Sequence, residues 1–482
     1  MLPYHHKFLN PFAMTIQFMG AAQTVTGSKH LITTADGYRI LLDCGLFQGI
    51  NTDELNQEFH FNPAEVDVLI LSHAHIDHTG LVPRLVRQGF TGPIFATPST
   101  LDLCEIMLRD SARIQVKDLE RVNKRRRNRN EPELELLYDE TDVQQALNQM
   151  QPVAYGLRTY LNPNVSFLYT DTGHLLGSAA ISLSIDETGP DGNKVQKRVF
   201  FSGDIGRPND KILRTFETFP QADYILCEST YGDRIHETET DMKAHLLRIV
   251  EETCVQKRGK LLIPAFAVDR TQELIYALDQ LASEGRLPTL PVYIDSPMSV
   301  SATKVMREHE EDFNPEILAY IKKDGDAFDF PNLHYVSDVE QSKAINAKKE
   351  PCIIIAPSGM AEAGRIKHHI KNNVEDPSTT ILFVGYASPN SLGGILKRGD
   401  KQVNIFGERY DVNATVEIMD SFSAHGDSAE MLQFLSCQNP AAVKTLFLVH
   451  GDLEKQQVWR EKLLAAGFPN VVIPAMYEKV DL

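Results

Sequence analysis

The chain has 482 residues, of which 42% are hydrophobic and 23% charged, so it is long enough for two or three globular domains. Its formal net charge of −17 disfavours a protein that coats nucleic acid through a basic surface. No apolar run reaches the roughly 18 residues of a membrane span, and residues 1–12 lack a signal peptide's apolar core, so we expect a cytoplasmic protein without a membrane partner.

Short apolar runs along the chain end repeatedly in a polar residue. They are residues 38–42 before Asp43, 66–71 before His73, 199–201 before Asp204, 224–227 before Glu228, 352–356 before Ser358, and 444–449 before His450. Continuous apolar runs of this length are typical of strands buried on both faces. The apolar spacing in residues 100–129, 241–256 and 270–284 indicates helices. We therefore predict an α/β fold with its polar residues gathered at strand ends, where such folds place their chemistry.

The run His73-Ala74-His75-Ile76-Asp77-His78 follows the second of these strands. Two histidines two residues apart can reach one metal ion from a tight loop, and the next aspartate and histidine turn towards a neighbouring site. Imidazole and carboxylate donors without a thiolate suit zinc, with manganese or iron as alternatives. A lone histidine is more often a hydrogen-bonded structural residue, but this pattern after a buried strand argues against that interpretation. The sequence therefore predicts a two-metal hydrolase site.

Such a site needs more ligands than this run supplies, and the other candidates also stand at strand ends. They are His174 in Thr-Gly-His-Leu-Leu-Gly-Ser, Asp204 in Ser-Gly-Asp-Ile-Gly, and His450 in Leu-Val-His-Gly-Asp. Each is a moderate candidate by itself. Because all three follow the first run in this order, the set together is a more specific signal of a metal site than any one of them.

With these motifs the chain resembles the metallo-β-lactamase superfamily, and in particular its β-CASP branch of nucleic-acid-processing enzymes. About 245 residues separate Asp204 from His450, which leaves room for an inserted domain. Glu228 in Cys-Glu-Ser-Thr-Tyr-Gly-Asp resembles motif A of that branch, His425 in Phe-Ser-Ala-His-Gly-Asp resembles motif B, and His450 resembles motif C. The chain is most similar to prokaryotic ribonucleases related to the endonuclease subunit of the cleavage and polyadenylation specificity factor.

The resemblance implies a centre with two Zn²⁺ ions, for which Mn²⁺ or iron are alternatives. It implies that His73, His75 and His174 hold one ion, that Asp77, His78 and His450 hold the other, and that Asp204 bridges them. It also implies that Asp43, in Leu-Leu-Asp-Cys-Gly, orients ligands through hydrogen bonds.

The histidine of motif C goes with RNA-processing members of the branch, so the resemblance favours RNA. It implies a zinc-dependent RNA phosphodiester hydrolase, an endoribonuclease with 5′-3′ exonuclease activity as a further option, in which two metals activate the attacking hydroxide. The candidate catalytic residues are Asp77, Glu228 and His425, the last two as a proton-donor pair. Candidates for contacts with substrate phosphate are Ser229, Thr230, Ser358 and Ser423, although serines in turns more often cap backbone groups.

We expect a metallo-β-lactamase αβ/βα sandwich formed by residues 1–230 and 420–482, with an inserted α/β β-CASP domain at residues 231–419. RNA is expected to lie in the interdomain cleft, and a homodimer is left open. Two alternatives remain: a metal-dependent hydrolase of DNA or of a small phosphodiester, and a non-catalytic RNA-processing subunit. The intact set of ligand candidates argues against the latter.

Three further features do not fit this scheme directly. The run Lys124-Arg125-Arg126-Arg127-Asn128-Arg129 could guide RNA, but a solvated helix end is the more common reading of such a run. His368 and His369 are expected to be surface residues. Ala387 and Gly394 stand where the family commonly has glutamine and arginine, so contacts with substrate are expected to differ there.

Overall fold

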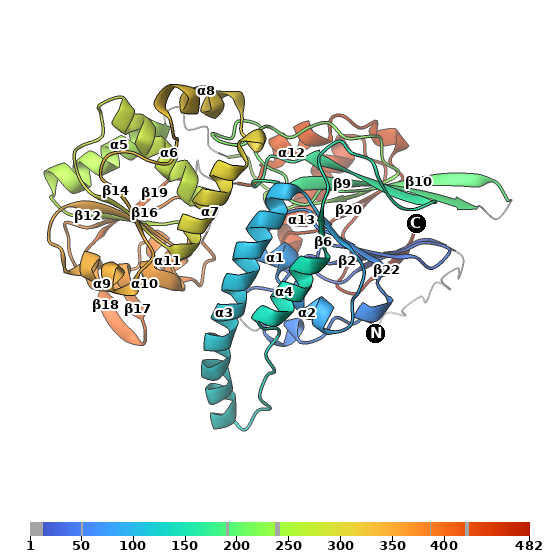
Figure 1. The fold of residues 1–482 in the computed structure, drawn as a ribbon, viewed down its shortest axis with the longest axis horizontal. Helices are drawn as coiled ribbons and strands as arrows, with labels where there is room; N and C mark the ends of the chain where they lie inside the picture. Colours follow the sequence, from blue (N-terminus) through green and yellow to red (C-terminus); the bar gives the residue numbers. More distant parts are fainter. Residues whose placement is uncertain (1–12, 50–51, 189–191, 237–241, 386, 420–423) are drawn as a thin grey trace. The chain divides into compact units, whose positions relative to one another are not determined.

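The computed structural model describes residues 13–49, 52–188, 192–236, 242–385, 387–419 and 424–482 (Figure 1). The chain forms two compact units. Unit 1 consists of Met1–Asp210, Thr215–Ile235 and His425–Leu482, and unit 2 of Lys211–Arg214 and His236–Ala424. Within the described ranges, no helix is both long enough and apolar enough to cross a membrane.

Unit 1 contains two seven-stranded sheets. The first has the order β22 (Lys479–Asp481), β1 (Thr15–Phe18), β2 (His30–Thr33), β3 (Arg39–Leu42), β4 (Val68–Ile70), β5 (Ile94–Ala96), β6 (Met150–Pro152). The second has the order β21 (Val471–Val472), β20 (Thr445–Leu448), β11 (Tyr224–Cys227), β10 (Lys194–Phe201), β9 (Ala179–Thr188), β8 (Val165–Asp171), β7 (Thr159–Asn162). In each sheet four neighbouring strands run parallel, β3 to β6 in the first and β10, β11, β20 and β21 in the second. Parallel pairing brings the carboxyl ends of these strands to one edge of their sheet.

The inner faces of the two sheets share one hydrophobic core, to which Ile40 and Phe167 belong. Side chains alternate along a strand, so Leu41 points to the opposite face, and it is also completely buried. Helices α12 (Ser428–Leu435) and α13 (Leu453–Ala465) cover the second sheet through residues such as Phe434 and Trp459. The expected αβ/βα sandwich is confirmed.

The other helices of unit 1 are α1 (Ile76–Thr79), α2 (Val82–Arg87), α3 (Pro98–Asn128) and α4 (Glu140–Gln149). Helix α3 confirms the helix predicted over residues 100–129. It begins with the Thr97 hydroxyl accepting the Thr100 amide and with Pro98 in its first turn, both favourable at a helix start. Its C-terminal half extends beyond the neighbouring helices of unit 1 (Figure 1).

Unit 2 is built on a six-stranded sheet whose strand pairs are all parallel. The strand order is β14 (Leu333–Val336), β13 (Val292–Asp295), β15 (Cys352–Ala356), β12 (Lys260–Pro264), β16 (Thr380–Phe383), β19 (Thr415–Ile418). A hairpin of β17 (Gln402–Ile405) and β18 (Glu408–Asp411) is separate from it. The helices are α5 (Met242–Val250), α6 (Arg270–Ser283), α7 (Pro297–Glu308), α8 (Pro315–Asp324), α9 (Val339–Ala347), α10 (Gly364–Asn373) and α11 (Leu392–Lys397). The helix predicted over residues 241–256 is α-helical from Met242 and ends in a π-helical turn, Glu251–Gln256.

The expectation that His369 is a surface residue is wrong. It lies on the inward face of α10 beside Ile366 and Ile370, and its side chain is completely buried. Its Nε2 is 2.7 Å from Asp295 Oδ2, and its Nδ1 is 2.9 Å from Asn346 Oδ1. Polar partners on two neighbouring elements make this burial acceptable, and such partners cannot be recognised from the local sequence.

Candidate metal centre

The loop after β4 brings the first four candidate ligands together in unit 1. It leaves the sheet at Ser72, and His75 precedes the first turn of α1, which contains Asp77 and His78. The loop 43–46 packs directly against this turn, and a Cβ atom on Gly45 would overlap the Asp77 carbonyl oxygen. Glycine therefore permits the close approach that fixes this turn.

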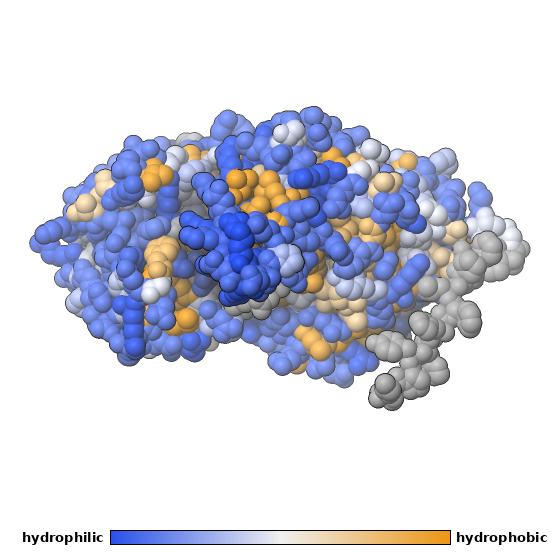
Figure 2. All heavy atoms as spheres, turned by 90° about the horizontal axis from the view of Figure 1, so that it is seen from below, coloured by the Kyte–Doolittle hydropathy of each residue, from blue (hydrophilic) through white to orange (hydrophobic). Residues whose placement is uncertain are grey.

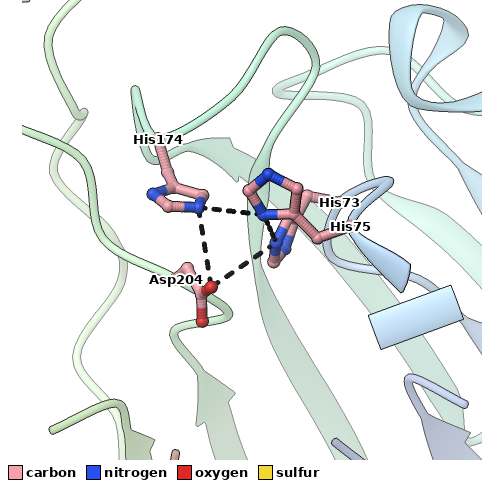
Figure 3. Close-up of side chains that lie close together, drawn as sticks. All are labelled: His73, His75, His174 and Asp204. Atoms are coloured by element: carbon pink, nitrogen blue, oxygen red, sulfur yellow. Dashed lines mark hydrogen bonds and ion pairs between the residues drawn. The ribbon is translucent and has the colours of Figure 1, made fainter. Parts of the chain in front are cut away.

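One cluster of donors consists of His73, His75, His174 and Asp204 (Figure 3). Nδ1 of His75 lies 3.0 Å from Nε2 of His73 and 3.3 Å from Nε2 of His174. Nε2 of His73 and Nε2 of His174 are each 3.5 Å from Oδ2 of Asp204. Three imidazole nitrogens and one carboxylate oxygen thus converge on one point.

A second cluster consists of Asp77, His78 and His450. Nε2 of His450 is 3.1 Å from Nε2 of His78 and 3.4 Å from Oδ2 of Asp77. The remaining oxygen of Asp204, Oδ1, lies 3.4 Å from His78 Nε2 and 3.5 Å from His450 Nδ1. The Asp204 carboxylate therefore stands between the clusters, with one oxygen beside each.

Asp204 Oδ1 is buried, and among the described residues it has no hydrogen-bond partner. A buried carboxylate oxygen that accepts no hydrogen bond is costly unless a cation binds it. The donors around it are imidazole nitrogens and carboxylate oxygens, the chemistry that zinc and related transition metals prefer. The residues present therefore fit metal ions at both clusters.

Burial sets the charge of the first cluster. It lowers the pKa of His73 well below its ordinary value, and it lowers the pKa of His75 to about 4 against the opposing charges of Asp77 and Asp204. Burial would raise the pKa of the Asp204 carboxyl, but His450 and the other surrounding imidazoles hold that pKa well below its usual range. A neutral His73 and His75 beside an ionised Asp204 are in the protonation states in which these groups bind metal ions.

Asp43 supports the second cluster from behind. Nδ1 of His78 donates to Asp43 Oδ2 at 2.6 Å, which leaves Nε2 of His78 facing the cluster. The backbone amide of Ser72 donates to the Asp43 carboxylate at 2.7 Å and the Ser72 hydroxyl at 2.9 Å. Against the effect of burial, Asp204 and Asp43 raise the pKa of His78 well above its ordinary value, so a metal ion that binds there displaces a proton. The sequence pattern did not identify Ser72, because a single serine at a strand end has no distinguishing signal.

Glu228 and His425 form a pair beside the first cluster. Nδ1 of His425 lies 3.1 Å and 3.2 Å from the two carboxylate oxygens of Glu228, and its Nε2 is 3.9 Å from Asp204 Oδ2. Glu228 is completely buried and accepts the backbone amides of Ile205 and Thr230. Burial disfavours the cationic form of His425, but Glu228 and Asp204 outweigh it and raise the pKa of His425 to about 9. The pair therefore holds a proton next to the donor clusters.

Two of the candidate phosphate contacts have structural partners instead. The Ser229 side chain is completely buried, and its hydroxyl donates to the Val449 carbonyl and accepts the Gln456 amide. A buried hydroxyl with two protein partners has no free face for a phosphate, so the interpretation of Ser229 is wrong. The Thr230 hydroxyl lies 3.1 Å from His450 Nδ1 and donates to the His450 carbonyl at 3.2 Å, so it orients that histidine.

For the other two candidate phosphate contacts, Ser358 and Ser423, the phosphate role stays a prediction. Ser358 belongs to unit 2, where its hydroxyl donates to the Ala363 carbonyl and accepts the Ala363 amide. Ser423 lies outside the described residues.

Three family models match parts of the chain. The metallo-beta-lactamase superfamily model matches residues 28–96, the Beta-Casp domain model residues 271–396, and the Zn-dependent metallo-hydrolase RNA specificity domain model residues 409–474. The first match includes the run from His73 to His78, and the third includes His425 and His450.

Curated relatives are similar over most of the chain. Ribonuclease TTHA0252 of Thermus thermophilus is 36% identical over 454 residues, which are 94% of this chain and 95% of that protein. Transcription termination factor FttA of Methanosarcina mazei is 29% identical over 448 residues, 90% of this chain and 66% of that protein. FttA of Methanocaldococcus jannaschii is 30% identical over 455 residues, 91% of this chain and 67% of that protein.

A solved structure has a similar fold. The crystal structure of a protein of unknown function from Enterococcus faecalis V583 matches with a TM-score of 0.51 and 11% sequence identity. The match covers 98% of this chain and 100% of that chain. At this identity the likeness concerns the fold alone.

Proposed function

The chain belongs to the β-CASP family of the metallo-β-lactamase superfamily, and from this premise we propose that it is a zinc-dependent ribonuclease. Its 36% identity to a ribonuclease and the match of residues 409–474 to an RNA specificity domain support RNA as the substrate. The observation that carries the proposal is the buried Asp204 carboxylate, which has one oxygen beside each of two donor clusters. Paired metal sites of this kind occur in phosphatases and nucleases.

We propose that the two clusters hold two Zn²⁺ ions, for which Mn²⁺ or iron fit the same donors. The proposed ligands are His73, His75 and His174 for one ion and Asp77, His78 and His450 for the other, with Asp204 shared. When bound, such ions lower the pKa of water and neutralise charge on a phosphate.

In this proposal, His425 donates the proton to the leaving oxygen. Because Nδ1 of His425 faces Glu228, the proton available for donation is on Nε2, on the side of Asp204. Glu228 fixes the orientation of the ring and stabilises its protonated form. The phosphodiester would lie against the clusters with its leaving oxygen towards Nε2. Endonucleolytic cleavage, a 5′-3′ exonuclease activity, the position of RNA between the domains and a homodimer stay predictions.

Cleavage of end-labelled RNA and of DNA with the matched sequence tests this function. We expect the protein to cleave RNA, to lose activity when a chelator removes its metal ions, and to regain activity when Zn²⁺ or Mn²⁺ is added back. Products from internal positions of a 5′-labelled RNA indicate endonucleolytic cleavage. Cleavage of DNA but not RNA, or RNA cleavage that is unaffected by the chelator, would contradict the proposal.

Replacing Asp43 with asparagine tests the support of the second cluster. The carboxylate that accepts Nδ1–H of His78 would be lost while the side-chain volume stays the same. Loss of such a partner typically weakens metal binding about 10- to 100-fold. Zinc affinity measured by competition with a chromophoric chelator should fall by this amount, and excess zinc should restore most of the RNA cleavage. An affinity equal to that of the wild type would contradict the role of Asp43.

A further inference from the structure

Helix α3 connects the candidate metal centre to a distant part of unit 1. At its N-terminal end, the hydroxyls of Thr97 and Thr100 donate to the carbonyl of Gly177, three residues after His174. The helix continues for 31 residues, which corresponds to about 45 Å at a rise of 1.5 Å per residue. Its C-terminal half extends past the neighbouring helices in Figure 1. We call residues 117–129 the α3 tip.

The α3 tip is held in place by the segment that follows it and by Glu54, which precedes it in the chain. The amide of Asn123 donates to the Leu134 carbonyl, and its oxygen accepts the Leu134 backbone amide, both at 2.9 Å. Arg126 pairs with Glu54 at 3.4 Å, and Arg127 pairs with Glu133 at 2.7 Å. The helix end is therefore a fixed element.

Of the other cations of the α3 tip, Arg121 forms an exposed ion pair with Asp118 at 3.6 Å, and the rest form no ion pair with the described residues. Residues 117–129 contain seven Lys or Arg and two Asp or Glu, a local net charge of +5 in a chain of net charge −17. Lys124, Arg125 and Arg129 are exposed, and their side chains form no ion pair with the described residues. Figure 2 views the molecule from the side to which this helix end points, and the most hydrophilic residues gather over it at the centre.

The spacing of these cations makes a ridge. Lys117, Arg121, Arg125 and Arg129 follow one another at intervals of four residues. Side chains four residues apart lie on one face of a helix, separated by about 6 Å along the axis. The ridge therefore presents a row of positive charges about 18 Å long.

We propose that the α3 tip binds the sugar–phosphate backbone of the RNA whose scissile bond lies at the metal centre, and this inference rests on the proposed function. Lysine and arginine in a row neutralise successive phosphates without reading the base sequence. Residues 117–129 contain no aromatic side chain, whereas the buried centres of protein interfaces are enriched in aromatic anchors and depleted in charged residues. The composition of the ridge therefore fits a nucleic-acid backbone better than an acidic protein surface.

The distance between the two sites sets a requirement on the RNA. About 45 Å corresponds to roughly 13 stacked nucleotides at about 3.4 Å each. An RNA of about 30 nucleotides can contact both the α3 tip and the metal centre, whereas one of about 4 nucleotides is too short to contact both. The contribution of the tip should therefore appear only with the longer RNA.

The test is the triple variant K124E/R125E/R129E of the full-length protein, with K194E/K322E/K323E as a control of equal charge change at exposed positions. RNA binding is measured by fluorescence anisotropy in a chelating buffer, which prevents cleavage. For the RNA of about 30 nucleotides, we expect Kd to rise at least about 10-fold and the slope of log Kd against log salt to fall by about 2. The control variant should change Kd less than about twofold, because it removes no phosphate contact.

Kinetics with metal ions present separate this inference from the proposed function. The triple variant should raise KM for the long RNA, leave kcat unchanged, and cleave the short RNA as the wild type does. The inference would be overturned if the triple variant had the same Kd, salt slope and KM as the wild type, even if the protein cleaves RNA. Weakened binding of poly-aspartate with unchanged RNA binding would also overturn it, in favour of an acidic protein partner. A wild type that binds RNA through the tip but cleaves none would instead contradict the proposed function.

Discussion

Replacing Asp204 with alanine is expected to reduce RNA cleavage at least about 10³-fold. The reason is that one carboxylate serves both donor clusters, with Oδ2 3.5 Å from His73 and His174 and Oδ1 3.4 Å from His78. Its removal leaves two sets of buried imidazoles without a shared negative charge. Both proposed metal ions should therefore bind more weakly.

Metal content separates this explanation from simple misfolding. We expect elemental analysis to find about two zinc ions per wild-type chain and at most one in the Asp204→Ala protein. Asp53→Ala, which removes an exposed aspartate of unit 1, is the control and should keep both activity and metal. A folded Asp204→Ala protein that binds two zinc ions and cleaves RNA at the wild-type rate would refute the proposed centre.

Replacing His425 with alanine is expected to lower kcat about 10²- to 10⁴-fold while leaving metal content unchanged. The ring lies 3.9 Å from Asp204, and its other nitrogen is held by Glu228 at 3.1 Å, so it is placed to donate a proton without being one of the proposed ligands. The loss should depend on the leaving group. An activated phosphodiester with a p-nitrophenolate leaving group needs no proton donor, so the variant should cleave it almost as fast as the wild type.

The Glu228→Gln protein provides a matched test of the same role. Glu228, together with Asp204, raises the pKa of His425 to about 9 against the effect of burial, and glutamine removes one of these charges with little change in shape. His425 then loses its proton at a lower pH, so the alkaline limb of the pH–rate profile should move to lower pH. Bound cations lower this pKa in both proteins, so the difference between them keeps its sign. The contrary outcome has two parts: the His425→Ala variant loses equal activity on RNA and on the activated substrate, and the alkaline limb of the Glu228→Gln profile stays in place. These two results together would show that Glu228 and His425 have a structural role and do not donate a proton.

Much of the fold could be predicted because its signals are local. The apolar runs 352–356 and 224–227 became central strands β15 and β11, and the spacing of residues 100–129 became α3. The centre could be anticipated for a related reason. Donor residues that directly follow buried parallel strands are brought to the edge where those strands end.

The parts that failed depend on contacts between distant segments. Ser229 looked available for phosphate, but Val449, directly after β20, and Gln456 of α13 supply the partners of its hydroxyl from more than 200 residues further along the chain. His369 was expected to be exposed, but its two ring nitrogens contact Asp295 and Asn346 in the interior of unit 2. Neither set of contacts can be predicted from the sequence next to Ser229 or His369.

The departure at Gly394 has a packing explanation. It lies in the first turn of α11, and a Cβ atom there would overlap the carbonyl oxygen of Ser388. The arginine that is common at this position in the family would require a different course of residues 388–394. Glycine at position 394 therefore accompanies a particular course of the local backbone, and it also removes the positive charge of the arginine.

The order of the donors along the chain has a consequence for synthesis. His425 and His450 follow the whole of unit 2 in the sequence, and β20, which precedes His450, is an interior strand of the second sheet. Domains generally fold from the N-terminus as the chain emerges from the ribosome, but unit 1 lacks part of its sheet until the segment after unit 2 has appeared. A ribosome-bound chain that has not reached β20 therefore carries His73 and Asp204 without His425 and His450. The two donor clusters can therefore become complete only after the segment that follows unit 2 has been synthesised.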